Sequence, residues 1–160
     1  MLPQLLNTYS RNLDYARRLV ADVPEDKMAY QPAPGMNHPA WVLGHLAFVG
    51  DMVGGLLGQG PLAPEAWEPI FGNSSKPSAD AALYPSKTEL VGALGRSHAR
   101  IASLVGALTP EALAQPLPKE EYRKHFPTTG DALLYLMTFH DGVHLGQLSA
   151  WRRVQGMPSV

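Results

Sequence analysis

The sequence predicts an all-α protein, a four-helix bundle, on three observations. Four segments, each long enough for several helical turns, place apolar residues at steps of three and four. Stretches rich in proline and glycine separate these segments. Nowhere does the pattern indicate a convincing pair of strands. With 160 residues, one domain covering residues 1–160 is the natural expectation.

The first helix is expected over residues 2–22. Leu5, Tyr9, Leu13 and Ala16 belong to an apolar stripe at helical spacing, with charged residues off that stripe. Pro24 ends the helix, and the proline-rich segment 23–37 is expected to be a loop with at most a short helical turn.

The second helix is expected over residues 39–58, with a proline at its first position. This segment is apolar on most faces, so a membrane span has to be weighed against a buried helix. His45, Asp51 and several glycines argue for a helix buried in a bundle. Gly50 and Gly54 would let a neighbouring helix approach closely.

A long loop follows at residues 59–85, where prolines recur. It is long enough to run the length of a bundle, so the second and third helices can lie parallel. Trp67 and Phe71 in this loop could form a lid over a site or simply pack the loop. Loops of this length are often functional.

The third helix is expected to begin after Ser86, which forms a capping box with Glu89, and to continue to Leu108. His98 lies beside its apolar stripe and is expected at the surface or the boundary. A short helix can open at Thr109. Residues 116–127 form a second long loop, in which His125 is expected at the surface.

The fourth helix carries the most informative pattern. Thr128 and Asp131 predict its start, and an apolar stripe continues to Trp151. His140 and His144 lie one turn apart on this stripe, with Cβ atoms about 5–6 Å from each other. Both imidazoles can then reach one divalent metal at about 2.0–2.1 Å if a third ligand arrives from elsewhere.

Two alternatives to this metal site stay open. A helical histidine pair can be a hydrogen-bonded core feature. The zinc peptidase pattern HExxH is matched imperfectly, because Asp141 stands where that pattern has its general-base glutamate, so peptidase chemistry is not expected.

The candidate third ligand is His45. It shares a stripe with Trp41 and Phe48, which directs it into the core. There it either bonds to a backbone carbonyl or meets His140 and His144 at a metal, because an unpaired buried imidazole is costly. His98 is the reserve ligand.

Composition excludes several functions. The formal net charge of −1 gives no basis for nucleic-acid binding. The absence of cysteine excludes disulfides, thiolate ligands and a cysteine nucleophile. The first residues lack a basic start followed by an apolar run, so no signal peptide and a cytoplasmic location are expected.

Several motifs together resemble the DinB-like (YfiT-like) family. They are residues 41–47 (WVLGHLA), residues 140–147 (HDGVHLGQ), Arg152 with Arg153, and Gly156 with Pro158. The resemblance extends in helix order along nearly the whole chain. It implies an up-down-down-up four-helix bundle in which His45, His140 and His144 bind zinc or nickel, and it implies homodimers. For some relatives it also implies transfer or isomerisation with a low-molecular-weight thiol such as bacillithiol or mycothiol.

We therefore expect a metal-dependent enzyme acting on a small molecule, with thiol transfer as the leading reaction and hydrolysis second. The alternative is a metal-binding bundle without catalysis, with a structural or stress-related role. Gln147 is expected either to orient a metal-binding histidine or to face solvent. Gly142 and Gly146 would permit tight packing beside the ligands.

Overall fold

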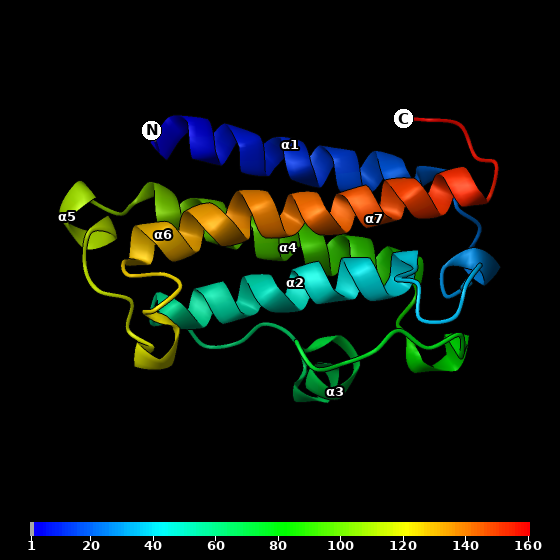
Figure 1. Ribbon diagram of the computed structural model, residues 1–160, viewed down its shortest axis with the longest axis horizontal. Helices are drawn as coiled ribbons and strands as arrows, with labels where there is room; N and C mark the ends of the chain where they lie inside the picture. Colours follow the sequence, from blue (N-terminus) through cyan, green and yellow to red (C-terminus); the bar gives the residue numbers. More distant parts are fainter. Residues whose placement is uncertain (1) are drawn as a thin grey trace.

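Long helices lie side by side in the computed structural model, which describes residues 2–160 (Figure 1). They are α1 (Leu2–Ala21), α2 (Pro39–Leu56), α4 (Lys87–Gly106) and a continuous helical stretch made of α6 (Thr129–Leu134), the π-helical segment η5 (Tyr135–His140) and α7 (Asp141–Val154). In Figure 1, α1 and the α6–α7 stretch run in one direction and α2 and α4 in the other. The expected all-α helical bundle is confirmed.

The described part of the chain contains no strand, only an isolated bridge between Pro116 and Thr128. Within residues 2–160, no helix combines the length and apolar character that crossing a membrane requires.

α2 is the most deeply buried of the long helices. Almost all of its residues up to Gly54 are buried, which explains why its sequence is apolar on most faces. Pro39 is the first helical residue, and the His38 ring accepts a hydrogen bond from the Trp41 amide. A Cβ on Gly50 would lie 1.9 Å from Ser97 Oγ, so the predicted close approach of α4 is confirmed there.

The loop between α2 and α4 packs onto α2. It contains η2 (Glu65–Trp67), α3 (Glu68–Phe71) and η3 (Ala81–Leu83). Trp67 and Phe71 are buried in the core, so they pack the loop and do not form an exposed lid. The Phe71 ring occupies the space where a side chain on Gly44 would be, with a Cβ there only 2.1 Å from Cε1.

Capping residues fix the starts of α4 and α6 where predicted, although for α4 the structure shows one half of the predicted capping box. Ser86 accepts from the Glu89 amide, and Thr128 and Asp131 form a reciprocal capping box. A short α5 (Pro110–Leu113) and η4 (Glu120–Tyr122) lie in the connection between the two helices.

The π-helical segment η5 is the one departure from the predicted fourth helix. A wide turn changes which residues share a face, and an apolar pattern at steps of three and four does not reveal it. The Asn12 amide of α1 donates to the Met137 carbonyl in this segment, at 3.2 Å. Such segments occur frequently at functional sites, and this one ends at His140.

Candidate metal centre

Three histidines from two helices converge in the middle of the bundle. His45 comes from the interior of α2, His140 from the last position of η5 and His144 from the first turns of α7. One ring nitrogen of each lies within 4.8 Å of those of the other two. The structure thus brings together the three predicted side chains, which could hold a metal ion.

His45 is oriented by the loop that packs on α2. Its Nδ1 lies 2.7 Å from the carbonyl oxygen of Phe71. Because a carbonyl only accepts, Nδ1 carries the proton, and the lone pair of the neutral ring is on Nε2. Trp41 stacks on the ring, with centroids 4.5 Å apart and planes 9° from parallel. His45 therefore bonds to a backbone carbonyl, as expected for a buried imidazole, and it also lies beside the other two histidines.

His144 is oriented by Gln147, one turn further along α7. Its Nδ1 lies 3.0 Å from Gln147 Oε1, and the same oxygen accepts from Asn37 Nδ2 at 2.8 Å. With this amide oxygen as the acceptor, His144 Nδ1 is the donor and Nε2 holds the lone pair. Gln147 is thus placed to orient His144.

His140 is the least constrained of the three. Its Nε2 lies 3.2 Å from His45 Nε2, while its Nδ1 is buried without a hydrogen-bond partner within residues 2–160. Nitrogens bound tetrahedrally to one zinc ion at about 2.1 Å are about 3.4 Å apart, so the spacing of His45 and His140 is close to that of a metal-bound pair.

The electrostatics favour neutral imidazoles. Burial, together with the neighbouring histidines, lowers the pKa of His140 to about 3 and that of His144 to about 4. Burial also lowers the pKa of His45. A metal-binding histidine must be neutral, so these three rings can offer lone pairs at neutral pH. Three imidazoles are a donor set that suits zinc and similar divalent transition metals.

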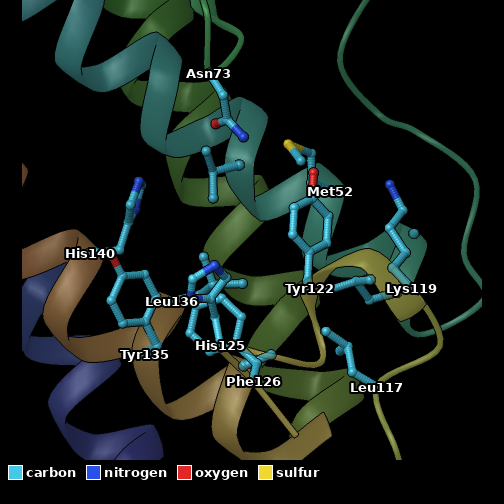
Figure 2. A pocket seen from close by; sticks show the side chains of 14 residues that line it. Met52, Asn73, Leu117, Lys119, Tyr122, His125, Phe126, Tyr135, Leu136 and His140 are labelled. Atoms are coloured by element: carbon cyan, nitrogen blue, oxygen red, sulfur yellow. The ribbon is translucent and has the colours of Figure 1, made fainter. Parts of the chain in front are cut away.

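A cavity of about 650 Å³ adjoins the cluster, and His140 forms part of its wall (Figure 2). The cavity lies between the second half of α2, the loop before α6, and η5. Its other lining residues are Val49, Met52, Gly55, Leu56, Asn73, Leu117, Lys119, Tyr122, His125, Phe126, Ala132, Tyr135 and Leu136.

The remaining histidines lie elsewhere. His98, the reserve ligand, is buried and not at the surface as expected: it stacks on Tyr9, and its Nε2 lies 3.6 Å from Asp141 Oδ2. It is outside the three-histidine cluster. His125 is exposed as predicted and lines the cavity. His38 is buried, and its ring nitrogens contact the carbonyls of Met28 and Ser78.

The sequence predicts Asp141 at the surface or at a helix contact, and tight packing at two glycines beside the ligands. Asp141 is buried at a contact with His98 of α4, because it continues the buried line of Met137 and Leu148 at helical spacing. That spacing was a signal present in the sequence. Gly142 and Gly146 do not permit tight packing, since a Cβ on either would meet nothing within 4 Å.

Together, the helical bundle and the buried histidine cluster define a class of all-α proteins with a candidate metal centre in the bundle core. A comparison with protein families finds that the model of the DinB superfamily matches residues 8–148. Because this match covers most of the chain, the chain belongs to the DinB superfamily. A search of curated protein sequences finds no match.

Proposed function

We propose that His45, His140 and His144 bind one divalent transition metal through their Nε2 atoms, with zinc or nickel as the metal. The convergence of these nitrogens beside a cavity carries the proposal. Membership of the DinB superfamily supports it, as it supports an up-down-down-up four-helix topology for the bundle.

The histidines have the features that metal ligands need. His45 and His144 are each held by a hydrogen bond to Nδ1, which fixes the tautomer and directs Nε2 inward. Three protein ligands leave coordination positions open, as in catalytic rather than closed structural zinc sites. A metal held in this way would lower the pKa of a thiol or water bound to it.

The reaction we propose is transfer of a low-molecular-weight thiol to an electrophile. The sequence contains no cysteine, so the nucleophilic sulfur has to come from solution. The sulfur forms a bond to an electrophilic carbon, the leaving group departs with the electron pair of its bond, and the thiol proton passes to solvent. His140 borders both the cluster and the cavity, which would bring the two reactants together.

The experiment combines metal analysis with an activity screen. Elemental analysis of the purified protein should find one transition metal per chain. Metal-loaded protein should add glutathione, bacillithiol, mycothiol or coenzyme A to model electrophiles, with metal-free protein and His140→Ala as inactive controls. Equal rates with and without metal would refute thiol transfer. Metal-dependent hydrolysis in the same screen would replace it, and bound metal without any activity would favour a non-catalytic bundle.

We further propose that the chain forms homodimers, as the family resemblance implies. Phe139 and Val143 are exposed one helical turn apart, which supports a surface that a second copy covers. Sedimentation velocity of the wild type and of Phe139→Ser tests this: the wild type should sediment as a dimer and the variant as a monomer.

A further inference from the structure

The cavity beside His140 has the size and chemistry of a small-molecule site. Its volume of about 650 Å³ lies within the usual range for ligand pockets, roughly 300–1,000 Å³. Several of its walls are aliphatic side chains of α2 and η5, including Val49, Met52 and Leu136. Such walls favour a ligand with an apolar body.

Aromatic rings form one side of the cavity and lead toward the histidine cluster. Phe126 contacts Tyr135 with ring centroids 4.9 Å apart, and Tyr135 lies 6.5 Å from the His140 ring. Tyr122 adds a further ring on the loop before α6. Aromatic walls of this kind bind flat, ring-containing molecules well.

Charge is distributed unevenly around the cavity. Lys119 supplies a permanent positive charge, and no carboxylate lies among the described residues of the lining. Figure 2 shows Lys119 and His140 on opposite sides of the cavity. A molecule that spans it can therefore place an anionic group at Lys119 and another atom at His140.

We propose that this cavity binds a small, ring-containing organic anion, and that this molecule is the electrophilic substrate. The apolar body packs against α2 and η5, the anionic group pairs with Lys119, and the reacting carbon faces His140. The assignment of this ligand as the substrate rests on the proposed function. Its binding to the cavity does not depend on that function.

Direct binding tests the site without requiring metal or turnover. The probe is 8-anilinonaphthalene-1-sulfonate, an aromatic anion whose fluorescence rises in apolar surroundings. It should bind metal-free and metal-loaded protein saturably at one site per chain. Gly55→Phe should lower the affinity at least about tenfold, because Gly55 lines the cavity and its Cβ direction is open. Leu136→Trp should act similarly from the opposite wall.

A matched control separates blocking of the cavity from a general effect of the substitution. Gly106→Phe introduces the same side chain near the end of α4, where a Cβ would make only an ordinary 3.6 Å contact with Leu6. This variant should bind the probe like the wild type. Circular dichroism and thermal unfolding verify that each variant is folded. Unchanged affinity in both folded cavity variants, Gly55→Phe and Leu136→Trp, would overturn the proposed site.

The charge of the ligand is tested separately. Lys119→Gln should weaken binding of the anionic probe about tenfold and leave binding of the neutral dye Nile red unchanged. Lys124→Gln, an exposed residue of the same loop, is the control and should change neither. If Lys119→Gln affects neither dye, the anionic part of the proposal is wrong. If the protein binds the dye but takes up no metal and shows no activity after metal loading, the proposed function is refuted and the cavity site is not.

Discussion

Two buried histidine sites lie on either side of one helical turn, where consecutive residues His140 and Asp141 point to different neighbours. His140 joins His45 and His144, and Asp141 faces His98 at 3.6 Å. In the first site, ring nitrogens face each other with no carboxylate among them. In the second, one imidazole is stacked on Tyr9 beside an acid.

The difference concerns what each site needs in order to be stable. Burial lowers the pKa of His98 to about 4 and raises that of Asp141 to about 8, so both groups are neutral near pH 7 and the pair requires no ion. The three-histidine cluster instead gathers one ring nitrogen of each histidine within 4.8 Å of the other two, and a cation between them could bind all three. Burial of a histidine alone therefore does not identify a metal ligand. The convergence of ring nitrogens is what supports the three proposed ligands.

The largest difference between the two sites should appear in the metal content of variants that lack one or more histidines. His140→Ala combined with His144→Ala should reduce metal content from one per chain to none, because only His45 remains. His98→Ala and His125→Ala should retain the metal. Elemental analysis after dialysis measures this. Metal retained in the double variant, or lost on changing His98, would reverse the assignment of the two sites.

A second contrast uses two glycines of α2. Gly44→Ala should lower metal affinity by about 10–100-fold, because its Cβ displaces Phe71, whose carbonyl orients His45. Gly50→Ala meets Ser97 on the α4 side and should leave affinity unchanged. Both should lower the free energy of unfolding by about 1–3 kcal/mol, since steric displacement outweighs the roughly 1 kcal/mol that alanine gains in a helix.

Chelator competition and urea unfolding measure these two quantities. Equal metal affinity in Gly44→Ala and Gly50→Ala would contradict the predicted role of Phe71 in orienting His45.

A third experiment uses pH to probe the His98 site in metal-free protein. The pKa of His98 is depressed from the ordinary 6.5 to about 4 in the folded state. Between these values His98 binds a proton in the unfolded chain but not in the folded chain, so the contribution of His98 to stability falls as pH drops through this window. From pH 7 to pH 5 the wild type should lose about 2 kcal/mol more than His98→Phe. Urea unfolding at both values tests this, and identical losses would argue against a neutral buried His98.

The smallest expected effect concerns Gln147. Gln147→Leu removes the acceptor for His144 Nδ1 but none of the ligands, and should lower metal affinity about tenfold. Thr138→Val, on an exposed part of η5, is the control. Competition with a chelator measures the metal affinity of both variants. If Gln147→Leu binds the metal as tightly as the wild type, Gln147 does not orient His144.

Much of this arrangement could be predicted from the sequence. Helical periodicity, Pro39 and the Thr128–Asp131 capping box locate the long helices because these signals are local. His45, His140 and His144 were predicted together partly from their inward positions and partly from the family resemblance. The structure places them together.

The features that the sequence does not predict depend on contacts between segments that are distant along the chain. The Phe71 carbonyl reaches His45 only because a loop folds back onto Gly44, and no local pattern encodes that contact. The π-helical turn before His140 preserves the apolar spacing while changing the face of the helix.

The proposed function depends on one divalent metal bound between the Nε2 atoms of His45, His140 and His144. The most direct test is a crystal structure of the metal-loaded protein with anomalous data collected on either side of the metal's absorption edge. We predict a single strong anomalous peak at about 2.0–2.2 Å from all three Nε2 atoms. A peak beside His98 and Asp141, or none in the cluster after loading, would contradict the claim.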